Sequence, residues 1–545
     1  MDDSSAASTQ NTNVHEPPGA ARATVGATAM LGTGILASRV LGLVREMLAA
    51  KRFGATRVRD CFNVASQLPF AIHTGVGTLL TGAVIPVFTS YISRRKENEG
   101  WRVVGTVCTI LLVTLAVVWA VATAAAGRLA PVLGPGFEPE WESVTARLLR
   151  LTLPYLVVAS LGAIFLCIVL SYQRFLPPAV AHAVPNVLII AALLGLGESL
   201  QIDALAIGWV LGGIGFTVAL LPAVWRLKGG RPLLALDVRD QGVKQVGRLC
   251  LPLAIPTALG PIVAMAKRAL ASELRAGGIA ELDYAEDIAL IPVGILVAAT
   301  STVVLPKLAQ QVARDDVEGM KRLISIGLRL VVALTVPAMV LAMMLRHSIV
   351  RVLFQRGQFG PQATSRVAEV LLWSGGTLVA AGFVEVLTRS FHACQDTLTP
   401  SAVSVGGSLV RLCLMLATVG PLGIRGLAAS GWLTQGLISG AMATALRRRL
   451  GPMGGRRIGR CFLGISVAGL AMALVLRVTM VEVLPAWHAA GGTQEALWLA
   501  LQCAIGAGVY ILLVLIFNPA DRRAAFSHVS GTRGQERASG ARPDC

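Results

Sequence analysis

Residues 103–124 read VVGTVCTILLVTLAVVWAVATA and carry no charged side chain. A helix needs about 20 predominantly apolar residues to cross the hydrocarbon core of a bilayer, so this stretch is long enough to span it. A transmembrane β-strand needs only about half that length, and a backbone surrounded by lipid must satisfy its own hydrogen bonds. The stretch therefore predicts a transmembrane helix and an all-α integral membrane protein.

Similar apolar stretches recur along nearly the whole chain of 545 residues. Hydrophobic residues make up 54% of the sequence, charged residues only 14%, and the mean hydropathy is +0.68. This composition excludes a disordered chain, a secreted disulfide scaffold and an ordinary soluble enzyme. We expect about fourteen transmembrane helices, near residues 24–50, 61–91, 103–131, 146–171, 178–197, 204–225, 246–273, 282–306, 323–345, 365–391, 401–419, 424–446, 461–482 and 496–517.

The charge of the chain is strongly basic, with 48 Lys and Arg against 30 Asp and Glu, a net charge of +18. In a soluble protein this excess would suggest a nucleic-acid partner, but basic residues of membrane proteins gather in cytoplasmic loops. Basic residues cluster after the second, sixth, twelfth and fourteenth stretches, whereas residues 132–144, 198–203 and 483–495 contain no Lys or Arg. We therefore expect both termini in the cytoplasm and no nucleic-acid partner. The first loop breaks this alternation through four basic residues, Lys51, Arg52, Arg57 and Arg59.

The sequence contains an internal repeat. Residues 75–86 (GVGTLLTGAVIP) resemble residues 294–306 (GILVAATSTVVLP), and residues 172–178 (YQRFLPP) resemble residues 394–400 (CQDTLTP). Both pairs are offset by an even number of predicted spans, so the copies should share one membrane orientation, as in transporters with two halves around a central cavity. We expect a disordered cytoplasmic tail (1–22), an N-lobe of six helices (23–226), a cytoplasmic linker (227–244), a C-lobe of six helices (245–450), two further helices (451–518) and a basic cytoplasmic tail (519–545).

Charged residues inside the first two predicted spans are candidates for function. A charge at the bilayer centre costs roughly 2.5–3.5 kcal/mol, so such side chains should face a cavity or a partner. Arg39 and Glu46 lie on one face of the first predicted helix, Arg45 lies on its flank, and Asp60 opens the second helix. Local ion pairs that hold the bundle together are one interpretation. We favour a second, in which Arg39 and Arg45 bind a phosphate-bearing ligand, because guanidinium groups match phosphate oxygens bidentately.

A second charged group lies in the seventh and eighth predicted spans. Lys267 and Arg268 come late in one apolar stretch. Acidic residues surround the start of the next: Glu281, Asp283, Glu286 and Asp287. These charges either neutralise one another or leave Lys267 or Arg268 to contact an anionic headgroup. Glu385 and Arg389, at i and i+4, predict a local ion pair that is structural or takes part in gating.

The sequence carries no motif of a known enzyme class. It contains no H-E-x-x-H, no P-loop and no G-x-S-x-G beside a suitable base. Its nine cysteines are scattered singly, which is typical of helix packing rather than of disulfides or metal ligands. We therefore expect a transporter without a cofactor, and the sequence leaves a coupling ion and its metal site open.

Several motifs occur in an order that is familiar. Residues 38–46 read SRVLGLVRE, residues 53–55 read FGA, residues 353–359 read LFQRGQF and residues 395–400 read QDTLTP. Together they resemble the MurJ/MviN family of the multidrug/oligosaccharidyl-lipid/polysaccharide flippase superfamily. The resemblance covers roughly residues 25–450.

The resemblance implies a bacterial inner-membrane protein of fourteen helices that serves cell-wall biogenesis and cell shape. The implied activity is the flipping of lipid II, the undecaprenyl-pyrophosphate-linked peptidoglycan precursor, from the cytoplasmic to the outer leaflet. It also implies a cationic central cavity, with Arg39, Arg45 and Asp60 at matching positions, and a lipid-tail groove at residues 451–518. Membrane lipids and peptidoglycan-synthesis proteins are the further partners implied.

At two positions the chain departs from the family pattern. The family usually has an Arg in span two, where the nearest residue here is His73. It also has an Arg after Tyr-Ala-Asp in span eight, where this chain reads Tyr-Ala-Glu-Asp and places Asp287. Lys267 and Arg268 would restore the lost positive charge. The departures leave two alternatives open: a paralogue that exports another polyprenyl-linked saccharide or a drug, and a non-transporting scaffold for envelope assembly.

Overall fold

The computed structural model describes residues 18–227, 235–314, 316–452, 454–487 and 492–517, so most of the two expected tails and part of the expected linker lie outside it. The described residues form helices and no strand, as the sequence predicts. The helices are α1 (Pro18–Phe53), α2 (Arg57–Ser93), α3 (Glu97–Ala124), α4 (Ala126–Leu133), α5 (Pro139–Thr152), α6 (Pro154–Ser171), α7 (Leu176–Ala181), α8 (Val184–Gly195), α9 (Gly197–Leu200), α10 (Ile202–Trp225), α11 (Gln241–Ser272), α12 (Gly278–Ala313), α13 (Val317–Met344), α14 (Arg346–Phe354), α15 (Pro361–Ser374), α16 (Thr377–Ala393), α17 (Leu398–Leu422), α18 (Ile424–Leu450), α19 (Gly455–Trp487) and α20 (Gly492–Phe517).

Each predicted span coincides with one helix or with consecutive helices. Fewer helices than predicted, however, are long and apolar enough to cross a membrane. In the described part of the chain, 10 helices are long and apolar enough to cross a membrane, or up to 11 if α15 and α16, bent by 41°, form one span. The expected count of about fourteen is therefore not confirmed. Proline explains two of the breaks, because Pro154 and Pro185 lie in the first turns of α6 and α8, where the missing N–H is not needed.

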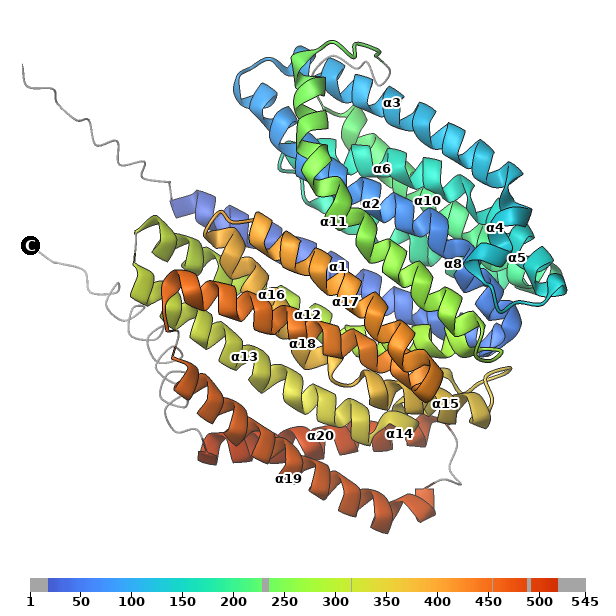
Figure 1. The fold of residues 1–545 in the computed structure, drawn as a ribbon, viewed down its shortest axis with the longest axis vertical. Coiled ribbons are helices and arrows are strands. Elements are labelled where there is room, and N and C mark those ends of the chain that lie inside the picture. The colour runs from blue at the N-terminus through green and yellow to red at the C-terminus, as the bar shows by residue number, and fades with distance from the viewer. Residues whose placement is uncertain (1–17, 228–234, 315, 453, 488–491, 518–545) are drawn as a thin grey trace, which may run out of the picture.

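The long helices form two groups that lie side by side (Figure 1). In one group α2, α3, α6 and α10 pack together, and in the other α12, α13, α16 and α18 do so. The two halves of the sequence interlock: α11 belongs to the second half but packs along α2, and α1 contacts both α8 and α12. The helices α19 and α20 pack on each other and on α13, outside both groups.

The turns after α6 and α16, which the sequence repeat relates, have the same backbone geometry. Gln173 and Gln395 occupy equivalent places and both adopt a left-handed backbone, with φ of 55° and 58°. In each turn this residue donates its N–H to the carbonyl three residues earlier, and the next residue donates to the carbonyl five residues earlier. The other repeated segment lies in α2 and α12. These two turns therefore share their backbone geometry as well as their sequence pattern.

The helix α3 illustrates how the fold meets a membrane. Val103 and Val104 are buried against the neighbouring helices. Val113, Val117 and Val121 follow one another on the opposite face, and each is more than half exposed. A stripe of exposed branched apolar side chains along a long helix is costly in water but suits contact with lipid. The chain is therefore a multi-pass membrane protein.

The turn before α17 is stabilised by a carboxylate, which yields a first prediction. Asp396 accepts hydrogen bonds from the N–H and hydroxyl of Thr399 at 3.0 and 2.8 Å and from Arg449 at 2.8 Å. These donors hold the pKa of Asp396 below its usual value. Asp396→Ala is expected to cost about 1 kcal/mol of stability at neutral pH. The measurement is the unfolding temperature of the purified protein as a function of pH. The difference in unfolding temperature between the variant and the wild type should become smaller below about pH 4, where the carboxylate becomes protonated.

Candidate functional site

A cavity of about 210 Å³ lies between the two halves of the protein. It is bounded by α1, α2, α10, α11 and α12. Charged side chains dominate its wall: Arg45, Glu46, Arg59, Arg268, Asp283, Glu286 and Asp287. The rest of the wall is formed by Phe62, Asn63, Ser66, Gln67, Phe70, Trp209 and Leu290. So many charges inside a bundle of apolar helices are expensive, which marks the cavity as the candidate functional site.

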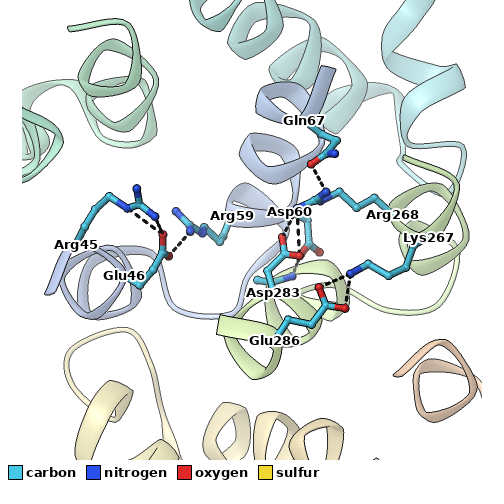
Figure 2. Close-up of polar contacts among 10 residues, drawn as sticks. Arg45, Glu46, Arg59, Asp60, Gln67, Lys267, Arg268, Asp283 and Glu286 are labelled. Carbon is cyan, nitrogen blue, oxygen red and sulfur yellow. Dashed lines mark hydrogen bonds and ion pairs between the residues drawn. The ribbon is translucent and has the colours of Figure 1, made fainter. Parts of the chain in front are cut away.

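On one side of the cavity, Glu46 holds two guanidinium groups (Figure 2). Arg45 donates from Nε and Nη2 to Glu46 Oε1 at 3.1 and 2.8 Å, and from Nη1 to Asn186 at 3.0 Å. Arg59 donates from Nη2 to the other oxygen, Glu46 Oε2, at 2.6 Å. The pair of Arg45 with Glu46 is one of the local ion pairs that the sequence left open as the alternative to ligand binding. Because Arg45 also lines the cavity, the pairing does not remove it from the site.

On the other side, α11 and α12 are joined by two ion pairs (Figure 2). Lys267 donates to both carboxylate oxygens of Glu286 at 2.7 Å. Arg268 donates to Asp283 at 3.0 Å and also to Gln67 of α2. Mutual neutralisation, one of the two predicted roles, is thus observed. Only Arg268 lines the cavity, whereas Lys267 is buried behind Glu286, so the geometry places Lys267 outside it.

The charge balance of the cavity differs from the cationic cavity that the resemblance implied. Its wall carries three guanidinium groups and four carboxylates, and Lys267 behind the wall makes the two signs equal. The carboxylate of Asp287 has no hydrogen bond or ion pair with any described residue. Within the described ranges, no group of three or more His, Cys, Asp or Glu side chains is arranged to hold a metal ion.

Asp60 lies outside the cavity, contrary to the expectation that it meets the ligand. Its fully buried carboxylate accepts hydrogen bonds from the N–H groups of Gly277 and Ala280 at 2.6 and 2.9 Å. Gly277 is the N-cap of α12 and Ala280 lies in its first turn, at the end of a helix that has unpaired N–H groups and favours a negative charge. Asp60 of α2 therefore caps a helix of the other half.

Two further contacts accompany this cap. The hydroxyl of Tyr284 donates to the carbonyl of Gly54 at 3.1 Å. Gly277 has a left-handed backbone, with φ of 83°, and a Cβ there would collide with the carbonyl of Ala55. We call the contacts made by Gly54, Ala55, Asp60, Gly277, Ala280 and Tyr284 the interlobe contact. It joins the α1–α2 turn to the α11–α12 turn.

The other predicted residues lie apart from the cavity. Arg39 is exposed beside Gly294 of α12, so it faces the seam between the halves but does not line the cavity. Glu385 and Arg389 form the expected ion pair within α16 at 2.6 Å. His73 packs edge-on against Tyr155, with ring centroids 5.3 Å apart.

Sequence reasoning passed over residues of α2 that line the cavity. Arg59 stood out only as a loop charge that breaks the alternation of basic loops. Asn63 and Gln67 follow it at i+4 and i+8, and these spacings place all three on one face of a helix. That polar face was the signal available. It escaped notice because single Asn and Gln residues within an apolar stretch do not by themselves indicate a site.

A second, larger cavity of about 1460 Å³ lies among α13, α16, α18 and α19. Its wall is mainly apolar and includes Val336, Met343, Phe383 and Leu470. Arg447, at the end of α18, is the charged side chain among its lining residues in the described chain. Most of its wall comes from α13, α16 and α18. The part from residues 451–518, where the resemblance implied a groove for a lipid tail, comes from α19 and the turn before it.

Comparison with known proteins places these features in a context. The family described as "Lipid II flippase MurJ" matches residues 49–494. The chain is 27% identical to the lipid II flippase MurJ of Burkholderia cenocepacia, covering 76% of this chain and 82% of the relative. It is 30% identical to the probable lipid II flippase MurJ of Rhizobium meliloti, covering 76% and 77%. A solved structure titled "Lipid II flippase MurJ, inward closed conformation" aligns with a TM-score of 0.76 at 22% identity, covering 90% of this chain and 98% of that one.

Proposed function

This chain belongs to the lipid II flippase MurJ family, and we propose that it moves lipid II from the cytoplasmic to the outer leaflet of the bacterial inner membrane. The observation that carries the proposal is the charged cavity between two halves of an otherwise apolar helix bundle. Lipid II offers a matching chemistry, with an anionic pyrophosphate and a polar headgroup on an apolar chain. No bond is made or broken in this process.

The cavity contributes Arg45, Arg59 and Arg268 to headgroup binding. All three are paired with carboxylates in the structure. An incoming pyrophosphate would compete with Glu46 for Arg45 and with Asp283 for Arg268, whereas Arg59 keeps two nitrogens that have no partner among the described residues. Phosphate oxygens compete well, because they form charge-assisted and often bidentate bonds with guanidinium groups. The carboxylates would then pair with the arginines whenever no ligand is bound. By competing for the same guanidinium groups, they would allow the headgroup to leave again.

The size of the cavity indicates a contracted state. Sites for drug-sized ligands have volumes of about 300–1,000 Å³, and the 210 Å³ cavity lies below that range. A saccharide-peptide headgroup would therefore require the halves to separate. We propose that they do so alternately on the two membrane sides, driven by the different affinities of the ligand for the two states.

The interlobe contact would close one of these sides. It lies at the α1–α2 and α11–α12 turns. The distribution of basic loops supports cytoplasmic termini, which would put these turns on the outer side of the membrane. Opening outward would then break the hydrogen bonds of Asp60 and Tyr284. The apolar cavity beside α19 would hold part of the polyprenyl chain during this step.

Leaflet accessibility of lipid II in living cells tests the proposal. Bacteria depleted of their own flippase would carry this full chain on a plasmid, and labelling from outside would quantify lipid II in the outer leaflet. We expect the chain to restore labelling and growth. Membrane insertion without any labelling, at normal total lipid II, would contradict the proposed activity.

A further inference from the structure

One face of α2 presents hydrogen-bond donors that have no acceptor. Arg59 and Asn63 are each only 5% exposed and both line the cavity. Within the part of the chain that the structure describes, Nε and Nη1 of Arg59 and Nδ2 of Asn63 have no hydrogen-bond partner. Buried donors in folded proteins are almost always paired, so three such atoms on adjacent turns of one helix need an explanation.

The surroundings of Arg59 keep its free nitrogens in place. Its Nη2 is tied to Glu46 at 2.6 Å. Its guanidinium lies 5.4 Å from the ring centre of Phe62 and 5.7 Å from that of Tyr284. An arginine held by an ion pair and two aromatic rings has lost most of its freedom before any ligand arrives, which favours binding.

Arg59 also differs from the other arginines of the cavity. Arg45 uses all three of its nitrogens in bonds to Glu46 and Asn186. Arg268 uses two nitrogens, and its Nε has no partner among the described residues. Arg59 therefore has two unpaired nitrogens where Arg268 has one, and Asn63 adds a third unpaired donor one turn away.

We propose that Arg59 and Asn63 form a subsite for the phosphoryl oxygens of a polyprenyl pyrophosphate, an inference that rests on the function proposed above. A phosphoryl group offers several acceptor oxygens around one centre, so it can satisfy donors from two side chains at once. It would pair the three nitrogens that the protein leaves unpaired. The Glu46 bond to Nη2 need not break, because the free nitrogens of Arg59 are the other two.

Asn63 provides the sharpest test, because its side chain makes no hydrogen bond with a described residue. Replacement by leucine, which has the same branching, breaks no hydrogen bond with a described residue, so the variant is expected to keep the stability of the wild type. A ligand-binding role predicts that the variant binds the ligand more weakly while its stability stays unchanged. Gln502 of α20 is the matched control. It is fully buried, and both polar atoms of its side chain lack a hydrogen-bond partner among the described residues. Unlike Asn63, it lines neither of the two cavities.

The experiment uses the purified full chain in phosphatidylcholine nanodiscs and two probes, undecaprenyl pyrophosphate and uncharged undecaprenol. Complete lipid II is measured beside them for comparison, and native mass spectrometry quantifies binding. Arg59→Lys and Asn63→Leu are each expected to bind undecaprenyl pyrophosphate about 10-fold more weakly, as expected for the loss of one hydrogen bond to a charged group. Affinity for undecaprenol should not change. Gln502→Leu and Arg147→Lys, the latter in an exposed ion pair with Asp203, should match wild type with both probes.

Three results would overturn the subsite. Wild-type affinity of both variants for undecaprenyl pyrophosphate would do so while leaving the proposed function intact. Losses seen only with complete lipid II would assign the donors to peptide carboxylates instead of phosphoryl oxygens. A wild-type chain that binds neither undecaprenyl pyrophosphate nor lipid II would contradict the proposed function itself and the subsite with it.

Discussion

Arg45→Ala is expected to lower lipid II transport by about 100-fold and to leave flippase-depleted cells unable to grow. The side chain makes two hydrogen bonds to Glu46 and one to Asn186, and it lies over the ring of Trp209 at 5.6 Å. Its removal deletes a guanidinium from the cavity and leaves Arg59 as the remaining partner of Glu46 among the described residues. Hydrogen bonds to charged groups are worth about 1.5–3 kcal/mol each, and about 2.8 kcal/mol corresponds to 100-fold.

Transport by Arg45→Ala should be measured as outer-leaflet labelling of lipid II, normalised to the amount of protein in the membrane. Arg147→Ala provides the control, because Arg147 forms an exposed ion pair with Asp203 at 3.4 Å, away from the cavity. The control is expected to transport normally. Normal transport by Arg45→Ala at equal membrane levels would show that the charged cavity does not bind the headgroup.

Asp60→Ala is expected to shift the equilibrium between the closed and open interlobe contact toward the open state by about 100-fold. The carboxylate satisfies the N–H groups of Gly277 and Ala280 at the N-terminal end of α12. Loss of two hydrogen bonds to a buried charged group costs about 3 kcal/mol or more. Because these bonds exist only in the closed state, the substitution raises the free energy of that state alone. Spin labels at the exposed positions Thr56 and Ala276 would report the separation of the two turns.

Gly277→Val gives an independent route to the same change. A Cβ at this position would collide with the carbonyl of Ala55, and the left-handed backbone disfavours a branched residue. Both variants should therefore lengthen the distance between the labels, whereas Asp396→Ala, far along the chain in another turn, should not. An unchanged distance in Asp60→Ala, in a protein that still inserts, would remove the interlobe contact from the proposed cycle.

Arg59 and Asp60 show how far prediction from the sequence could reach. They are neighbours in the chain, but the sequence singled out Asp60 as the charge that opens the second span and Arg59 only as a basic residue of the first loop. Successive residues of a helix point about 100° apart, so one could face a cavity while the other faced a neighbouring helix. Which one did so depended on where α12 begins in space, because its first N–H groups attract the carboxylate. The sequence favoured Asp60 for the ligand, and the structure places Arg59 in the cavity instead.

The sequence by itself determined the all-helical membrane fold and the family, and it predicted two related halves. These follow from local properties, namely runs of apolar residues, the period of the repeat and short motifs read along the chain. Tertiary structure alone decided which partner each charged side chain meets. The contacts between different helices include Glu46 with Arg59, Arg268 with Gln67, and Asp60 with Gly277. Such contacts depend on how helices pack across the seam between the halves, and no spacing along a single helix encodes that arrangement.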